Sequence, residues 1–512
     1  MSAETILAPQ WILKDSKVIS DLAVLVRDER IEAIDKLQVL RSLSPKVSEI
    51  LLPDCLVMAG FINAHQHGKG LGEVRFGYPD NFLEVWINNR AGRRPLDAYA
   101  STLIAAAHML ENGVTCIIHA NTTFGGEDYE TELRASLRAY DESGLRATVA
   151  IGAADQLALV YPYTEESSFL KRLPSEFATE YTSKRRFSYA GDAADTIGLM
   201  DRLLVDFEGH PRIQFCYGPA GPQWVSDELF RSLVKDAERR DLGLHMHCLE
   251  SPAQAAVCKR LYPEGTLRHL AKIGALTPKT VLAHGVFLTE DDILVAAKSD
   301  VTIVRNPGSN LRLRNGIAPL AHYLQEGVRV AIGTDNTAIA QDEDILKELR
   351  LAASLARSPH WSGPEPPLTK DLLDILTMNG AMAAQVAQDV GQLKVGMRAD
   401  LVAVNLKRAF WPGPQPDEDP IEALLNRAEG RDVVLTMVNG HILYKDGTLT
   451  RLDRDRLVEL GHALLRNVRN VPEKERQHLT TLLQEHMTEF YDNSTAGSIL
   501  PAKSLTRGLG PS

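Results

Sequence analysis

The chain has 512 residues, 44% of them hydrophobic and 24% charged, so we expect a large domain with an ordinary globular core and a smaller domain beside it. The net charge of −11 argues against a nucleic-acid-binding protein, which would need a basic face. Neither a signal segment nor an apolar run of about 20 residues is present, which argues against a membrane protein. The scattered cysteines, odd in number, indicate reduced thiols and a cytoplasmic location: Cys55, Cys116, Cys216, Cys248 and Cys258.

Short apolar runs separated by turns fill the first 58 residues. This pattern is typical of β-strands, but the stretch is too short to form a stable sandwich alone. An apolar run from Cys55 to Met58 then continues through Gly60, and we expect one short buried strand that ends at His65 and His67. Side chains at i and i+2 of a strand point the same way, so both histidines can reach one metal ion.

Eight strand-like apolar runs recur after residue 60, and helical patterns separate most of them. Strands that alternate with helices predict a parallel sheet, and eight such units predict a closed (β/α)8 TIM barrel. The alternative is an open doubly wound sheet, which the lack of a Gly-x-Gly-x-x-Gly or phosphate-binding loop after the first strand disfavours. The expected strands are 60–64, 114–118, 146–151, 213–217, 243–247, 281–284, 301–304 and 328–333.

Two connections between these units, residues 68–95 and 152–192, are long and rich in aromatic residues. Long loops above the strand ends of a barrel usually shape its pocket, and their aromatic side chains could stack on a flat ligand. Most of these side chains are expected to form small cores beneath the loops instead. Trp86 is the one that we place in the pocket wall.

The chain after residue 390 returns to strands that we expect to complete the N-terminal β-layer, including a hairpin with a tight turn at Asn439-Gly440. Charged helices over 453–491 and a loose Ser-, Gly- and Pro-rich tail follow. We therefore divide the chain into four parts: the first part of a small β-sandwich domain (1–58), the barrel (59–390), the second part of the β-sandwich (391–450) and a C-terminal helical extension with its tail (451–512).

Titratable side chains follow four of the expected barrel strands. These are His65 and His67 after the first strand, His245, His247 and Glu250 in and after the fifth, His284 after the sixth and Asp335 after the eighth. In a barrel all strand C-termini converge on one face, where active sites lie. Packing alone does not explain these residue types at four converging strand ends, so the sequence predicts a functional site there.

This pattern resembles the amidohydrolase superfamily, in the branch of aromatic-ring deaminases and chlorohydrolases that includes adenosylhomocysteine/methylthioadenosine deaminases, guanine deaminases and triazine hydrolases. The resemblance covers nearly the whole chain and is specific for the branch, not for the substrate. Its motifs are Gly60-Phe61-Ile62-Asn63-Ala64-His65-Gln66-His67, His247-Cys248-Leu249-Glu250, Ala283-His284-Gly285, Asn306-Pro307-Gly308-Ser309-Asn310-Leu311, Gly333-Thr334-Asp335-Asn336 and the Gly-x-Leu-x-x-Gly-x-x-Ala-Asp-Leu-Val pattern at 391–402.

The resemblance implies one divalent metal, zinc or alternatively iron, with four ligands: His65, His67, His247 and Asp335. His247 is preferred to His245 because it precedes Glu250 by three residues, as in the family. We expect His245 to be a packed barrel histidine. Binuclear members carry a bridging carboxylated lysine in the fourth strand, and this chain has no lysine there, which favours a single metal.

The residue types suit the chemistry that the resemblance implies. Neutral imidazoles and a carboxylate suit zinc, which lowers the pKa of water from about 15.7 toward about 7, so that hydroxide exists at neutral pH. Asp335 can accept the proton as water attacks. Glu250 would protonate a ring nitrogen and later assist the leaving group. His284 would polarise the water or the substrate.

The sequence departs from the nucleoside deaminases of the branch at two positions. Ala220 replaces a substrate-binding histidine that follows the fourth strand, which argues against adenosine-type substrates. Arg305 replaces the usual histidine before Asn-Pro. An arginine at the mouth of the pocket could bind a carboxylate or another anionic group of the substrate, or it could form a structural ion pair with a barrel carboxylate.

Two further residues belong to the candidate substrate-binding set. His119 ends the second strand and could contact the substrate or hydrogen-bond to a neighbouring loop. Asn310, in the Asn-Pro-Gly-Ser-Asn motif, is expected to brace its loop near the substrate.

We therefore expect a metal-dependent hydrolase that replaces an exocyclic group of an N-heteroaromatic ring with hydroxyl. An amine is the expected leaving group, because deamination is common in the branch. The first alternative is hydrolytic removal of chloride from a ring that could carry a carboxylate. The second is a non-catalytic barrel that serves as a binding protein, which the retained ligands and Glu250 disfavour. Members of the branch often form dimers, so we expect a homodimer or a higher homo-oligomer.

Overall fold

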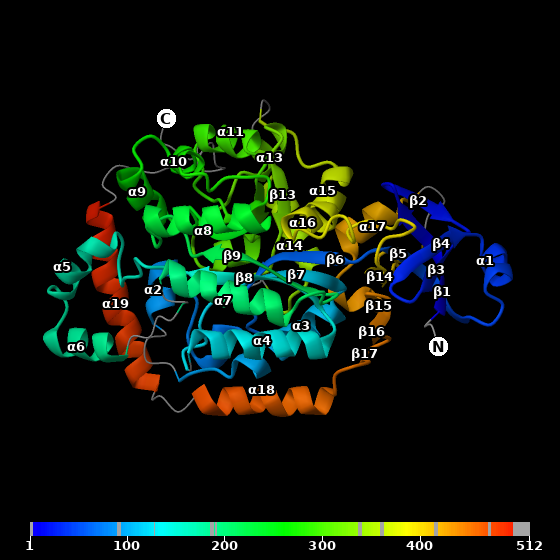
Figure 1. The fold of residues 1–512 in the computed structure, drawn as a ribbon, viewed down its shortest axis with the longest axis horizontal. Coiled ribbons are helices and arrows are strands. Elements are labelled where there is room, and N and C mark those ends of the chain that lie inside the picture. The colour runs from blue at the N-terminus through cyan, green and yellow to red at the C-terminus, as the bar shows by residue number, and fades with distance from the viewer. Residues whose placement is uncertain are drawn as a thin grey trace.

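Two β-sheets organise the computed structural model, which describes residues 4–89, 94–126, 128–184, 189, 192–335, 340–358, 363–413, 418–468 and 473–494. An eight-stranded sheet forms a nearly closed barrel surrounded by helices, and a nine-stranded sheet lies at one end of it (Figure 1). The fold class expected from the sequence, a (β/α)8 barrel with a small β-domain built from both chain ends, is confirmed. Asn336 and the tail from residue 495 lie outside the described residues.

The barrel strands lie side by side in chain order, and each neighbouring pair is parallel. Helices cover the outside and side chains fill the inside, so the strands are buried along almost their whole length. All eight expected strands are present: β6 (Phe61–Gln66), β7 (Val114–Ala120), β8 (Arg146–Ala153), β9 (Ile213–Pro219), β10 (Leu244–Cys248), β11 (Thr280–His284), β12 (Thr302–Arg305) and β13 (Arg329–Ile332).

Several helices of the barrel begin at clear capping signals. At five N-termini an Asp or Ser side chain accepts a hydrogen bond from the backbone N–H three residues later, which satisfies a donor that the helix leaves free. The helices are α3 (Ala98–Glu111), α4 (Tyr129–Ser143), α7 (Ala193–Asp206), α8 (Asp227–Arg240), α9 (Pro252–Leu261), α10 (Thr266–Lys272), α11 (Glu290–Lys298), α12 (Pro307–Arg312), α13 (Leu320–Gln325), α14 (Ile345–Leu355), α15 (Thr369–Leu376) and α16 (Met378–Ala383).

The second sheet joins the two ends of the chain, because β5 pairs in parallel with β1 on one side and antiparallel with β14 on the other. This strand membership supports our proposed division of the chain into four parts. The strands are β1 (Glu4–Lys14), β2 (Lys17–Ser20), β3 (Ala23–Arg27), β4 (Arg30–Asp35), β5 (Ser48–Ala59), β14 (Leu401–Asn405), β15 (Val433–Val438), β16 (His441–Lys445) and β17 (Thr448–Leu449); α1 (Leu37–Leu43) and α17 (Pro420–Arg427) lie beside them.

The expected single strand through Gly60 is wrong, because the chain changes sheets at this residue. Cys55 to Met58 belong to β5 of the second sheet, whereas β6 begins the barrel at Phe61. The N–H of Gly60 donates to the Asp400 carbonyl (2.9 Å). A Cβ at residue 60 would lie within 2.6 Å of three side-chain atoms of Thr115, so only glycine fits at this crossing without a shift of its neighbours.

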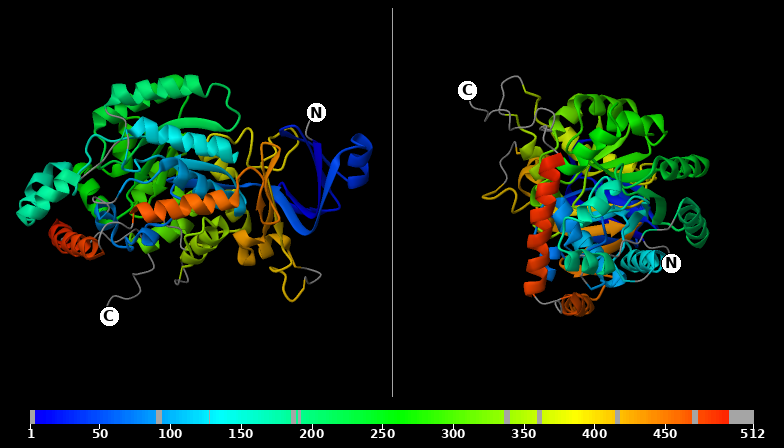
Figure 2. Two further views of the ribbon diagram at one scale, coloured as in Figure 1. Left: turned by 90° about the horizontal axis from the view of Figure 1, so that it is seen from below. Right: turned by 90° about the vertical axis from the view of Figure 1, so that its left-hand side faces the viewer.

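Two C-terminal helices pack along the barrel, as expected for residues 453–491. α18 (Arg454–Val468) lies against α3, and α19 (Glu473–Ser494) runs beside α2 (Leu83–Asn88) on the side opposite the second sheet (Figures 1 and 2). The connection after β8 contains α5 (Glu166–Leu170) and α6 (Ser175–Lys184) and lies close to α19. Apolar residues of α2, α5 and α19 form one buried cluster, so α19 is part of the packed structure.

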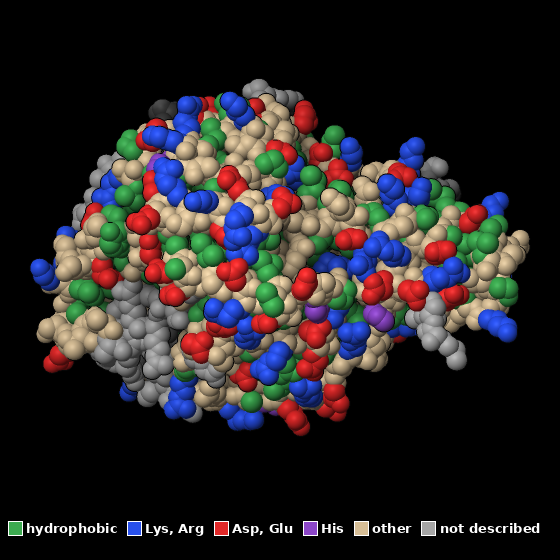
Figure 3. Space-filling model, in the orientation of Figure 1, with side chains coloured by type: hydrophobic (Ala, Val, Ile, Leu, Met, Phe, Trp, Pro, Cys, Tyr) green, Lys and Arg blue, Asp and Glu red, His purple; other side chains and the backbone are tan. Residues whose placement is uncertain are grey.

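Acidic and basic side chains are interspersed over the face shown in Figure 3, on both the barrel and the second sheet. Of the helices that the structure describes, none is long and apolar enough to cross a membrane. The homo-oligomeric state stays a prediction, since the structure is of one chain.

Candidate metal centre and active site

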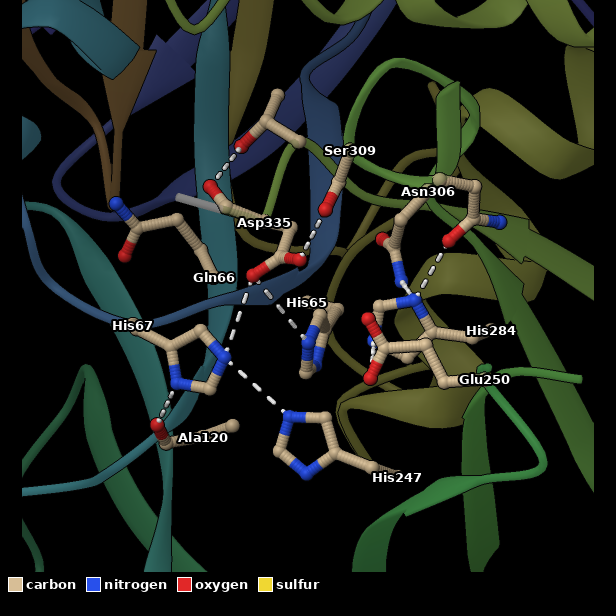
Figure 4. Close-up of polar contacts among 12 residues, drawn as sticks. His65, Gln66, His67, Ala120, His247, Glu250, His284, Asn306, Ser309 and Asp335 are labelled. Carbon is tan, nitrogen blue, oxygen red and sulfur yellow. Dashed lines mark hydrogen bonds and ion pairs between the residues drawn. The ribbon is translucent and has the colours of Figure 1, made fainter. Parts of the chain in front are cut away.

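Four side chains from three barrel strands converge at the C-terminal end of the barrel (Figure 4). His65 and His67 come from the end of β6, His247 from β10 and Asp335 from the turn after β13. Oδ1 of Asp335 lies 3.3 Å from Nε2 of His67 and 3.8 Å from Nε2 of His65. Nε2 of His67 lies 3.3 Å from Nε2 of His247. The residues that the resemblance implies as metal ligands therefore lie close together.

Hydrogen bonds on the far side of two rings determine which nitrogen faces the cluster. Nδ1 of His67 lies 2.7 Å from the Ala120 carbonyl, and Nδ1 of His247 lies 2.9 Å from the Ala220 carbonyl. A carbonyl oxygen can only accept, so each Nδ1 carries the proton and donates it. Each Nε2 then presents a lone pair to the centre, which is the arrangement that metal-binding histidines adopt.

His245 plays the same supporting part for His65. Its Nε2 lies 2.8 Å from Nδ1 of His65, and the two rings are stacked with centroids 5.1 Å apart. Burial lowers the pKa of His65 and His247 well below 6.5, and it lowers the pKa of His245 to about 3. All three imidazoles are therefore neutral at physiological pH, the form that binds metals.

The spacing of the donor atoms fits a metal ion. Two lone pairs that face each other at 3.3 Å, as on His67 and His247, repel unless a cation lies between them. Nε2 of His65 is buried and has no hydrogen-bond partner in the described part of the chain, which would be costly without such a cation. Ligands of a tetrahedral zinc at ~2.0–2.1 Å lie about 3.3–3.4 Å apart, close to the separations seen here.

Asp335 supplies a carboxylate that stays ionised. Burial alone would raise its pKa, but the surrounding imidazoles of His67, His65 and His284 outweigh burial and hold the pKa well below 3.8. Its Oδ2 accepts a hydrogen bond from the Ser309 hydroxyl (2.7 Å), which leaves Oδ1 directed at the histidines. Ser309 lies in the Asn-Pro-Gly-Ser-Asn motif, whose serine the sequence analysis gave no role.

Glu250 and His284 lie together beside the four converging side chains. Oε2 of Glu250 is 3.6 Å from Nε2 of His284, and both residues are buried. Burial, with the nearby Asp335 and Glu84, raises the pKa of Glu250 well above 4.5, which favours the protonated carboxyl. Two carboxyls with opposed pKa shifts in one site are typical of an acid and an ionised partner.

Amide side chains hold this pair in place. Asn315 donates to Oε1 of Glu250 (2.9 Å), and Oδ1 of Asn310 lies 2.9 Å from Nδ1 of His284. The amide oxygen accepts, so Nδ1 of His284 carries the proton and Nε2 is free to accept one. Burial lowers the pKa of His284, which keeps the ring neutral. Sequence reasoning missed Asn315, which no motif marked.

Further combinations of the same side chains could also hold a metal ion. Within the described residues, the ligand atoms of His65, His247 and His284 lie within 4.8 Å of one another, as do those of His65, His67 and Asp335 and those of Glu250, His284 and Asp335. All these groups share one small volume at the strand ends. The choice among them rests on the hydrogen bonds that orient each ring.

Comparison with known proteins agrees with this geometry. The model of the Amidohydrolase family matches residues 56–443, which is most of the chain. The chain belongs to the amidohydrolase family. Among its relatives is a 5'-deoxyadenosine deaminase of Methanosarcina barkeri, 30% identical over 410 residues, which cover 79% of this chain and 84% of the relative. The resemblance inferred from the motifs is thus confirmed, and the protein is an amidohydrolase-type hydrolase.

Two solved structures share the fold of this amidohydrolase. An adenosine deaminase from Xanthomonas campestris with bound zinc has a TM-score of 0.76 at 23% identity and covers 91% of this chain and 99% of its own. The atrazine chlorohydrolase of Arthrobacter aurescens in complex with zinc has a TM-score of 0.73 at 23% identity, with coverage of 90% and 100%. This chain therefore shares its fold with a deaminase and with a chlorohydrolase.

The remaining candidate residues of this amidohydrolase lie around the cluster, with their side chains in packed surroundings. Arg305 is buried near Tyr323, and its Nε and Nη1 have no hydrogen-bond partner among the described residues. Burial lowers the pKa of Arg305 to about 10. No carboxylate in the described part of the chain forms an ion pair with it, so a structural ion pair does not account for this arginine.

His119, Asn310 and Trp86 are also buried. Nδ1 of His119 lies 2.9 Å from the Tyr140 hydroxyl, and its Nε2 lies 3.3 Å from Nδ2 of Asn121. Asn310 braces His284, as described above. Trp86 packs in a small apolar cluster with Leu83 and Leu313. A direct contact between any of these side chains and a substrate stays a prediction.

Proposed function

We propose that this amidohydrolase binds one divalent metal, zinc or alternatively iron, through His65, His67, His247 and Asp335. We propose further that it replaces an exocyclic amine of an N-heteroaromatic ring with hydroxyl. The observation that carries this proposal is the convergence of three imidazole Nε2 atoms and one carboxylate oxygen beside Glu250, a buried carboxyl with a raised pKa. The absence of a lysine from β9 supports a single metal.

The metal would act as a Lewis acid that makes water nucleophilic at neutral pH. The side chains of the protein supply the proton transfers around it. Asp335, ionised, accepts a proton from the attacking water. His284, neutral and oriented by Asn310, accepts a hydrogen bond at Nε2 from the water or from the exocyclic group of the substrate.

Glu250 is the proton donor to the substrate. Burial beside Asp335 raises the pKa of its carboxyl and so favours the protonated form, which can transfer a proton to a ring nitrogen. The protonated ring is more electrophilic, so the water oxygen bonds to the ring carbon. One proton of the water passes through Asp335 to the exocyclic nitrogen, and the C–N bond breaks as ammonia leaves. The other water proton returns to Glu250 as the C–O bond becomes the ring carbonyl, a tautomer of the hydroxyl product.

Chloride is the second candidate for the leaving group. The same addition serves a C–Cl bond, and only the departing group differs. The position after β9 favours this alternative, because Ala220 stands where the nucleoside deaminases of the branch have a substrate-binding histidine, and its carbonyl is used to orient His247. A non-catalytic binding protein is the remaining alternative.

A screen of ring substrates tests the proposal. Purified protein is first analysed for metal and then given amino and chloro derivatives of triazines, pyrimidines and purines, each in a neutral and a carboxylated form. Ammonia and chloride release are measured separately, with Glu250→Gln protein as the blank. Ammonia release supports deamination and chloride release supports dechlorination. Protein that holds no metal after expression with zinc and iron would refute the proposed centre.

A further inference from the structure

A line of aromatic rings leads from the metal centre to the C-terminal helix. The Trp224 indole lies edge-to-face with the His247 imidazole (centroids 6.4 Å apart, 86° between planes), and Tyr161 packs edge-to-face on Trp224 (5.7 Å). Tyr491, near the end of α19, lies 5.7 Å from Tyr161. Elements far apart in the sequence therefore build one wall beside the proposed ligands.

The rings next to the proposed ligands differ in burial. His65, His67 and Asp335 are buried, whereas His247 is only partly buried and so is Trp224, which rests on it. Tyr161, behind Trp224, is 4% exposed. The indole is thus a partly exposed aromatic surface in contact with His247.

The local backbone has been shaped to admit this indole. A Cβ on Gly221 would lie 3.3 Å from Cε3 of Trp224 and 2.9 Å from the His247 carbonyl, so a side chain there would crowd the contact between the two rings. The Trp224 carbonyl accepts from the N–H of Gln156, in the connection after β8 (3.0 Å). The position of Trp224 is therefore fixed by its neighbours in the chain and by the connection after β8.

Polar contacts fix Tyr161 behind the indole. Its hydroxyl donates to Oε1 of Glu84 (2.6 Å), which also accepts from the Ser251 hydroxyl, next to Glu250. Its N–H donates to the hydroxyl of Tyr491 (3.2 Å). α19 is held in turn by Leu483, Met487 and Phe490, which are buried against α2 and the connection after β8. Tyr161 therefore connects α19 to Trp224 by direct contacts on both sides.

We propose that Trp224 is the platform on which the planar ring of the substrate packs, with Tyr161 and Tyr491 of α19 as positioning residues behind it. This inference rests on the proposed function for the identity of the ring, but not for the existence of the platform. An aromatic face beside the metal ligands suits a flat heteroaromatic ring, because every such ring has a π-face that can stack. The C-terminal helix α19 would then be part of the active site.

Direct binding to the full-length, metal-loaded enzyme tests the platform without turnover. Isothermal calorimetry uses hypoxanthine and cyanuric acid, two hydroxylated rings with no leaving group. Trp224→Ala should weaken binding of the better probe by about 5- to 150-fold, the range for loss of one base–aromatic stack. Trp224→Phe should restore most of the affinity. Zinc content should be unchanged in both variants.

The positioning role of Tyr491 is tested in the same assay. Tyr491→Ala should weaken ring binding several-fold and raise KM more than it lowers kcat, while Tyr491→Phe, which keeps the ring, should have a smaller effect. Tyr163→Ala, at an exposed tyrosine of the same connection as Tyr161, is the matched control and should bind as the wild type does.

The outcomes separate this inference from the proposed function. Equal affinity of the wild type and Trp224→Ala, or no binding of either ring by the wild type, overturns the platform. If rings bind and the affinity depends on Trp224, but no ammonia or chloride is released from any substrate, the platform stands and the proposed function fails. Loss of zinc from Trp224→Ala would assign the indole to support of His247 and also overturn the platform.

Discussion

The backbone N–H of Asp335 donates to the carbonyl of His65 (3.0 Å). This bond links the last barrel strand to the first at the end where the site lies, and the N–H of Thr334 adds a second link to Oδ1 of Asn63 (3.1 Å). The Asp335 carboxylate lies beside the His65 ring, with Oδ1 3.8 Å from Nε2. Closure of the barrel and assembly of the donor cluster are therefore one structural event.

Ser309→Ala should weaken metal binding without removing a ligand. The hydroxyl of Ser309 holds Oδ2 of Asp335, and loss of such a supporting contact typically costs about 10- to 100-fold in metal affinity. Titration of metal-stripped protein with zinc measures the effect, and added zinc should restore activity. Ser354→Ala, which removes an exposed hydroxyl on α14, is the control. Unchanged zinc affinity in Ser309→Ala would show that the contact is dispensable.

Glu250→Gln should keep the metal and lose turnover. The residue lies outside the four converging side chains, and glutamine can still accept from Asn315 but cannot give a proton. Loss of a general acid lowers kcat by about 10²- to 10⁴-fold. Elemental analysis and steady-state kinetics on one preparation measure both quantities. A variant without metal would contradict the role outside the ligand set.

The titration of Glu343 should lower the free energy of unfolding as the pH rises. Burial raises its pKa from 4.5 to about 8, so between these values the folded state holds a proton that the unfolded state has released. The free energy of unfolding then falls with rising pH, by up to about 1.4 kcal/mol per unit for this group. Its stabilising effect is complete below pH 4.5 and lost above pH 8.

Glu343→Gln should flatten this dependence, since an amide does not titrate. Urea unfolding of the zinc-saturated enzyme at several pH values between 5 and 8 measures the slope. Glu176→Gln, at an exposed position on α6, is the matched control and should keep the slope of the wild type. An identical slope in Glu343→Gln would contradict the raised pKa.

Arg305→Met should discriminate between two roles for a buried guanidinium. If Arg305 meets an anionic group of the substrate, KM should rise about tenfold or more for a carboxylated ring and stay unchanged for the neutral analogue. Paired kinetics on the two rings measure this. Equal changes for both rings would instead assign Arg305 to the surroundings of His284, whose pKa it helps to lower.

The barrel and the convergence of its strand ends could be predicted because both follow from periodicity. Parallel strands bring their C-termini to one face, and the i, i+2 spacing of His65 and His67 sets their common direction. The boundary between the two sheets at Gly60 could not be predicted, because an unbroken apolar run does not show where the hydrogen-bonding partners of a strand change.

The same i, i+2 rule would have placed one other candidate more accurately. Ile117 and Ile303 pack in the large core with the surrounding helices, while Ile118 and Val304 pack in the cluster that also contains Ile62 and Ala64. His119 lies two residues after Ile117, and its contact with Tyr140 of α4 places it on the helix-facing side of β7. Trp224 could not be found this way, because it lies beyond a strand end.

The single-residue crossing at Gly60 has a consequence for synthesis on the ribosome. β5 emerges early and can pair with β1, but its other neighbour, β14, is made only after all eight barrel strands. Throughout that interval the β14-facing edge of β5 stays open, and an open edge can recruit strands from other chains. The barrel can close through Asp335 and His65 before that edge is covered, so the catalytic end can mature while the opposite end is still exposed to misassembly.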